Sequence, residues 1–214
     1  MNVPFRVLVD DPAVDFDPCE LDGTCAVALE EDVTGWRPPF QADDGTAEDF
    51  RRSPNAVSLA GDALSVFFSI EELPVVSFNV VGFEVFGMSV GAAIGLDSIE
   101  LRTATVPGVP NMNAAGFIAA YDPAAPIVLP AVAGDTTAPI APFLVTPSAY
   151  GLAGLSVVVR YLAGENAANH TAIGLDTTPE TLLLLHSGRI PAGGAFSYEF
   201  AGNHMIRMLI QECP

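Results

Sequence analysis

The sequence predicts an all-β protein: an antiparallel β-sandwich, jelly-roll-like, with an irregular acidic arm at the N-terminus. Gly and Pro, 19 and 18 of 214 residues, interrupt the chain along its whole length. Between these breakers, apolar and polar residues alternate with a period of two in several segments. No stretch of ten or more residues keeps a convincing helical period. Many short strands joined by Gly- and Pro-containing turns are typical of sandwiches and jelly rolls.

The predicted arm covers residues 1–55 and differs in composition from the rest of the chain. It holds a large share of the acidic residues and the single tryptophan, Trp36. Residues 3–9 and 24–30 inside this arm have the pattern of β-strands. We expect an irregular extension that is ordered in part by packing on the remainder.

The predicted sandwich domain covers residues 56–214. Its alternation is clear over 98–104, where Ile99 and Leu101 oppose Glu100. Strands of this kind bury one face and belong to antiparallel sheets. The predicted strands are 63–70, 75–88, 98–104, 116–121, 126–130, 142–146, 154–162, 181–186, 195–200 and 204–211, with 177–186 alternatively a short helix.

Residues 108–147 form an apolar, proline-rich insertion in this domain. Proline removes a backbone donor, so this region is not a run of central strands. A long apolar loop must be covered, either by its own sandwich or by a neighbouring subunit, and we favour the neighbouring subunit. Its seven prolines are Pro110, Pro123, Pro126, Pro130, Pro139, Pro142 and Pro147.

The charge balance is strongly acidic. The chain has 26 Asp and Glu against 8 basic residues, all of them Arg, and its formal net charge is −18. Such a surface repels nucleic-acid phosphates and anionic lipids, which argues against direct nucleic-acid binding. The absence of lysine fits a saline environment, where salt screens the repulsion, or a GC-rich genome that encodes Arg in place of Lys.

One segment, 73–96, is apolar and long enough to span a membrane. It nevertheless contains Asn79, Glu84 and four glycines, and its Val and Phe content favours strands. We therefore expect buried strands and no membrane span. The N-terminus lacks a signal-peptide pattern, because its apolar run is short and is followed by acidic residues.

Acidic residues near the N-terminus form the strongest constellation for a ligand. Calcium binds six to eight oxygens from flexible, carboxylate-rich loops. The spacing of these acidic residues does not match an EF-hand loop. We therefore prefer a solvated acidic loop, and a Ca²⁺ site is the alternative. The candidate ligands are Asp15, Asp17, Glu20 and Asp22.

Signatures of catalysis are missing from the sequence. The histidines His170, His186 and His204 stand outside any known nucleophile or metal motif, and a phosphate loop ending in Gly-Lys is excluded without lysine. The cysteines Cys19, Cys25 and Cys213 do not have the spacing of a zinc or redox site, and their disulfide state stays open.

The hexapeptide AIGLDS (93–98) recurs as AIGLDT (172–177). The flanking sequences differ, so a duplicated domain is not supported. Gly permits a bend and Asp followed by Ser or Thr bonds to the backbone, so we expect one kind of corner used twice. Two equivalent ligand sites at Asp97 and Asp176 are the alternative.

These patterns favour a non-enzymatic structural subunit of a larger assembly, foremost a virus or phage particle (capsid, decoration, spike or tail component). The expected partners are further copies of the chain and other virion proteins, and the expected location is the virion, with the cytoplasm or an extracellular location as alternatives. The second hypothesis is a carbohydrate- or calcium-binding β-sandwich module. The third is a cupin-like or hydrolase enzyme, which would need the histidines to converge with carboxylates.

Overall fold

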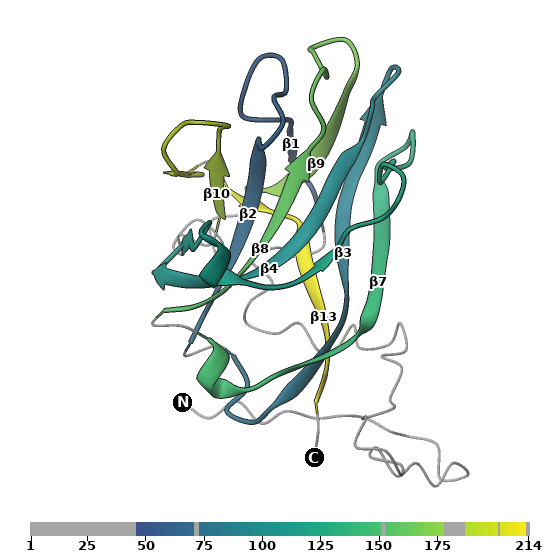
Figure 1. Ribbon diagram of the computed structural model, residues 1–214. Coiled ribbons are helices and arrows are strands. Elements are labelled where there is room, and N and C mark those ends of the chain that lie inside the picture. The colour runs from purple at the N-terminus through teal and green to yellow at the C-terminus, as the bar shows by residue number, and fades with distance from the viewer. Residues whose placement is uncertain (1–45, 71–72, 151–152, 178–186, 201, 213–214) are drawn as a thin grey trace, which may run out of the picture.

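The computed structural model describes residues 46–212, apart from 71–72, 151–152, 178–186 and 201. Over this range the protein is nearly all β, and two antiparallel sheets pack face to face (Figure 1). The predicted all-β sandwich is thus confirmed. Residues 1–45 lie outside the described part, and with them most of the predicted arm.

Eight strands give the sandwich its topology. If these eight strands are counted from 1 to 8 along the chain, independently of their labels, the first sheet has the order 1-8-3-6. The second sheet has the order 2-7-4-5. This is the strand order of a jelly roll, in which almost every connection crosses from one sheet to the other. The first sheet contains β1 (Asp49–Arg51), β9 (His170–Asp176), β3 (Phe78–Val90) and β7 (Gly134–Val145); the second contains β2 (Ala63–Ser69), β8 (Gly154–Tyr161), β4 (Leu96–Val106) and β6 (Phe117–Tyr121).

Shorter elements extend both sheets. The strands β10 (Ser187–Ile190) and β11 (Ser197–Tyr198) widen the second sheet beside β2. The strands β12 (Asn203–His204) and β13 (Ile206–Glu212) join the first sheet. Strand β3 is long enough to pair with β13 along its first part and with β9 along its last part. The other short elements are β5 (Val109–Pro110) and the 3₁₀ turns η2 (Ala114–Gly116) and η3 (Pro147–Ala149).

The core lies between the two sheets and follows the alternation of the sequence. Ile99 and Leu101 of β4 are fully buried in it, whereas Glu100 points to the outer face and pairs with Arg160. Strand β8 is buried on both faces, because Val158 is covered on the outer side by a smaller apolar cluster. Period-two patterning therefore places apolar side chains inside and leaves the charged ones outside.

The prolines of strand β7 lie at the edge of a sheet, where a missing backbone N–H donor is tolerated. Strand β7 contains Pro139 and Pro142 and pairs only with β3, so it is an edge of the first sheet. Before it, Ile127 and Leu129 are buried in the main core while Val128 between them is exposed. Part of the apolar segment thus packs on its own sandwich, while other residues such as Val128 stay exposed.

Several predicted strands differ from those observed. Residues 126–130 contribute only an isolated bridge between Ile127 and Leu96, 142–146 is the end of the longer β7, and 195–200 contains only β11. Strand β9 was not predicted. Its polar start and its internal glycine resemble a loop, and the strand forms because partners on both sides complete its hydrogen bonds.

The two hexapeptide copies have different structures, so the prediction of one corner used twice is wrong. In the first copy, residues 93–95 form the irregular end of the turn before β4, where Gly95 has φ +106°, and residues 96–98 begin β4 with Asp97 exposed. The second copy lies inside β9, and Asp176 is fully buried. The residues Ala-Ile-Gly are therefore irregular in one copy and strand in the other, according to the partners that tertiary structure supplies.

The apolar segment 73–96 forms β3 and the turn after it, as predicted. Within the described residues, no helix has the length and apolar character needed to cross a membrane.

Candidate functional site

Five connections leave the sandwich at the same end, which we call the loop end. The antiparallel register requires this: β2 begins and β10 ends opposite the end of β8, β4 begins there too, and β7 and β9 both begin beside the end of β3. The loop end stands at the top of Figure 1. Its segments are 53–61, 91–95, 123–133, 162–169 and 191–196.

The loop end is almost without charge. Glu165 is the one ionisable residue in its five segments, and it is 2% exposed. The margin of the loop end, where the segments join the strands, carries exposed or half-buried ionisable residues, among them Arg52, Asp97, Asp122, Asp135 and His170. On a chain of net charge −18, the five segments thus expose no acidic residue, whereas exposed aspartates stand at their margin.

Large apolar side chains are exposed on the loop end instead. Single exposed apolar residues are ordinary, but a group of them on an uncharged surface marks an interaction site. They are Val57 (52% exposed), Leu59 (49%), Ile94 (39%), Val128 (60%) and Val132 (80%).

A buried carboxylate fixes three of the loops to one another. Oε1 of Glu165 accepts hydrogen bonds from the backbone N–H groups of Ile94 (3.0 Å) and Gly95 (2.9 Å) and from Oγ1 of Thr171 (2.7 Å). Oε2 accepts one from the N–H of Thr171 (2.8 Å). In addition, the backbone of Ser58 bonds to that of Glu165. The turn after β3, the first loop and the β8–β9 loop thus share one anchor.

A second buried carboxylate, Asp62, holds the opposite side of the loop end. It accepts hydrogen bonds from Oγ of Ser53 (2.5 Å), Nδ2 of Asn55 (2.6 Å), and the backbone N–H groups of Leu59 (2.9 Å) and Ala192 (2.7 Å). Burial raises the pKa of Asp62, but these hydrogen bonds together outweigh burial and hold the pKa below its ordinary value. The carboxylate therefore stays ionised and ties the β10–β11 segment to the first loop.

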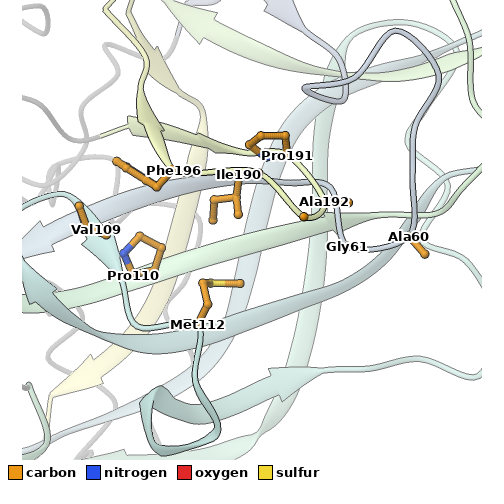
Figure 2. A pocket seen from close by; sticks show the side chains of 11 residues that line it. Ala60, Gly61, Val109, Pro110, Met112, Ile190, Pro191, Ala192 and Phe196 are labelled. Atoms are coloured by element: carbon orange, nitrogen blue, oxygen red, sulfur yellow. The ribbon is translucent and has the colours of Figure 1, made fainter.

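A shallow apolar pocket of about 390 Å³ lies beside the loop end on the outer face of the second sheet. Figure 2 shows Ile190, Pro110, Met112 and Phe196 around its floor and walls. Its upper rim, Ala60–Gly61 and Pro191–Gly194, belongs to the loop end itself. The described residues that line the pocket include no ionisable side chain, so the surface without exposed charge continues into it.

A buried histidine links the two sheets below the loop end. His204, on β12 of the first sheet, donates its backbone N–H to Oγ of Ser187 (2.8 Å), and its Nδ1 lies 3.3 Å from the carbonyl oxygen of Ser65. Both serines belong to the second sheet. His204 is 1% exposed, and among the residues that the structure describes its Nε2 finds no hydrogen-bond partner.

Three charged residues surround this histidine, namely Glu199, Arg51 and Arg189. Nε of Arg51 pairs with Oε2 of Glu199 at 3.2 Å, so the nearest carboxylate is already engaged. Burial is the main cause that lowers the pKa of His204, to about 4, although the Ser65 carbonyl and Glu199 oppose it. At neutral pH the imidazole is therefore uncharged, as a structural residue between two sheets must be.

The structure does not bring the described histidines together. His170 is the first residue of β9, whereas His204 pairs with Leu175 on the same strand. Five strand residues separate the two positions by roughly 17 Å. His186 lies outside the described residues, and so the convergence that an enzyme site would need is not observed for the pair that can be compared.

The calcium candidates Asp15, Asp17, Glu20 and Asp22 also lie outside the described residues, as do the three cysteines. In the part of the chain that the structure describes, no three His, Cys, Asp or Glu side chains group in a way that could hold a metal ion.

A row of aromatic side chains lies beside the pocket. The alternation over 195–200 places Phe196, Tyr198 and Phe200 on one face, and the ring centroids are 5.1 Å and 6.1 Å apart along the row. Phe200 is 72% exposed. The row continues from the pocket, where Phe196 forms one wall.

Reasoning from the sequence missed the loop end. The signal was present, because long stretches free of ionisable residues are unusual in so acidic a chain, but only the strand register shows that they meet at one end. Comparison of the chain with protein-family models, curated proteins and solved structures finds no match.

Proposed function

We propose that this protein is a non-enzymatic structural subunit of a larger protein assembly, and that the loop end is a contact surface in it. The observation that carries the proposal is the loop end, whose five segments expose large apolar side chains and no ionisable residue on a chain of net charge −18: Val57, Leu59, Ile94, Val128 and Val132. Interface cores are depleted of charged residues, and apolar patches with polar margins mark interaction sites.

The anchoring of the loops supports the same proposal. Loops that order only on binding lose conformational entropy at that moment, which weakens association. Glu165 and Asp62 already hold four of the five segments through hydrogen bonds to buried carboxylates. A surface fixed in advance suits a permanent contact between subunits.

The kind of assembly that we propose first is a virus or phage particle, in which the chain would be a capsid, decoration, spike or tail component. Jelly rolls are frequent in capsid proteins, but they also occur in lectins and cupins, so this step rests on analogy of fold. The partners would be further copies of the chain and other virion proteins.

The test is the mass of the full-length protein in solution, measured by multi-angle light scattering at low and high salt. We expect a defined multimer whose population grows as salt screens the repulsion between acidic copies. A monomer of 22.3 kDa at every salt concentration, also after mixing with the other proteins of its native particle, would contradict the proposal.

A carbohydrate-binding module is the second candidate, and the aromatic row favours it. Aromatic rings exposed side by side offer apolar faces on which sugar rings can stack. The residues are Phe196, Tyr198 and the most exposed member, Phe200. Binding on a glycan array that is lost in Phe200→Ala would support this candidate, whereas an empty array would remove it.

A further inference from the structure

We propose that an acid-sensitive strap covers the edge of β2, and that this strap opens at mildly acidic pH while the eight-stranded sandwich stays folded. The strap comprises residues 187–200 and β12. It follows the eighth strand of the sandwich and crosses from the second sheet, where β10 pairs with β2, to the first sheet, where β12 pairs with β9. Such a device acts within a single chain, so it does not depend on the proposed assembly role.

Polar contacts, more than apolar ones, hold the strap in place. Strand β10 pairs with β2, and the carboxylate of Asp62 accepts a hydrogen bond from the backbone N–H of Ala192 (2.7 Å). Among the described residues of the strap, Ile190 is the one buried apolar side chain, and it packs in a small cluster outside the main core. None of residues 191–200 is buried. A segment with so few buried apolar contacts opens at a smaller free energy than the core strands do.

His204 fastens the strap between the two sheets in a form that has no place for a second proton. Its Nδ1 lies 3.3 Å from the carbonyl oxygen of Ser65, which can only accept a hydrogen bond, so we assign the proton of the neutral ring to Nδ1. The other ring nitrogen, Nε2, finds no partner among the described residues. Protonation of the closed strap would therefore place a charge and an N–H group without acceptor on a residue that is 1% exposed, and both are costly.

The charged groups around the ring do not offset this cost. They are Glu199, which follows β11, Arg51 of β1 and Arg189 of β10. The carboxylate of Glu199 already pairs with Arg51 at 3.2 Å, and both guanidinium groups repel a protonated ring. On β9, the buried Asp176 lies opposite the residue that precedes the histidine. Burial outweighs the attraction of Glu199, and the closed strap therefore keeps the imidazole neutral.

Opening of the strap brings His204 into water, where its ordinary pKa of 6.5 lets it take up a proton as the pH falls. Because the pKa in the closed strap is about 4, the equilibrium constant for opening rises about 30-fold between pH 7.5 and pH 5. Opening also removes the β10 partner from residues 63–66 of β2 and uncovers Val158 beneath Ile190. An unpaired strand edge can accept a strand of another chain, so acid would expose a new pairing surface.

The experiment is amide hydrogen exchange of the full-length protein, followed by mass spectrometry at pH 7.5 and pH 5 and corrected for the intrinsic effect of pH on exchange. It compares peptides from β10 with peptides from the central strand β8. His204→Gln removes the titrating ring from the strap. His170→Gln, which removes a histidine outside the strap at the start of β9, is the matched control.

In the wild type and in His170→Gln, we expect β10 to open more readily than β8 at both pH values, and its opening constant to rise about 30-fold toward pH 5. His204→Gln should lack this rise. Equal opening constants for β10 and β8 in the wild type at pH 5 would show that only the whole fold opens, and would overturn the strap; this comparison needs no variant. A rise in His204→Gln as large as in the wild type would assign the effect to another group and would also overturn the proposal.

Discussion

The buried His204 makes the stability of the fold depend on pH in a way that one substitution isolates. Above pH 6.5 the imidazole is neutral in both the folded and the unfolded chain. As the pH falls below 6.5, the histidine of the unfolded chain takes up a proton, while the buried ring, with its pKa lowered to about 4, does not. Protonation thus favours unfolding, and the folded state loses stability between pH 6.5 and 4.

The size of this loss follows from the two pKa values. A fall from 6.5 to about 4 corresponds to about 3 kcal/mol, at about 1.4 kcal/mol per pH unit. About 2 kcal/mol of it is lost by pH 5. Asp62 and Glu100 also have a lowered pKa, but as carboxylates they lose their contribution only below about pH 5, as the unfolded chain becomes protonated. The interval from pH 7.5 to 5 therefore reports on histidine.

The assay is urea unfolding of the wild type and of His204→Gln at pH 7.5 and pH 5. The variant loses packing at both pH values, but it cannot be protonated, and the other histidines contribute equally to both proteins. We expect the free energy of unfolding of the wild type to fall by about 2 kcal/mol more than that of the variant. Parallel changes in the two proteins would refute the reasoning and place the ring in contact with water.

Three further outcomes are expected. Glu165→Gln should lower the free energy of unfolding by roughly 2–4 kcal/mol in urea, because an amide NH₂ would face donors of the loops; a change below about 0.5 kcal/mol would show that the anchor is dispensable. Gly154→Ala should lower the free energy of unfolding by more than about 2 kcal/mol, because φ is +144° and a Cβ would stand 2.0 Å from a backbone oxygen. Gly193→Ala, at φ +68° in open space, should lower it by about 1 kcal/mol. Thermal unfolding compares the two variants, and equal losses would contradict the geometry. If the N-terminal acids bind calcium, Ca²⁺ should raise the Tm of the wild type but not of the double variant Asp15→Ala, Asp17→Ala; a Tm indifferent to Ca²⁺ would remove that hypothesis.

Local patterning was enough to predict the class of fold and the faces of most strands. In β4, Ile99 and Leu101 fill the core and Glu100 points outward because successive side chains of a strand alternate. Proline also acts locally. Because Pro139 and Pro142 lack a backbone donor, their segment cannot be a central strand in any fold, and β7 is indeed an edge strand.

The candidate site could not be predicted in the same way. The donors to Glu165 come from residues 94, 95 and 171, and those to Asp62 from residues 53 to 59 and from 192. Nothing in the spacing of these residues shows that they converge. Which carboxylates are buried anchors and which are solvated depends on contacts between segments that are far apart in the sequence.

The sequence by itself determined that the chain is acidic and forms short β-strands joined by turns, with enough apolar residues for a sandwich core. These properties depend on each residue and its immediate neighbours. Tertiary structure alone decided that Ala-Ile-Gly is irregular in one copy of the hexapeptide and strand in the other, that His204 is enclosed between sheets, and that five loops without an exposed charge meet at one end. The reason is that strand register joins residues distant in the chain, and burial, hydrogen bonding and the absence of charge at a surface arise only from that joining.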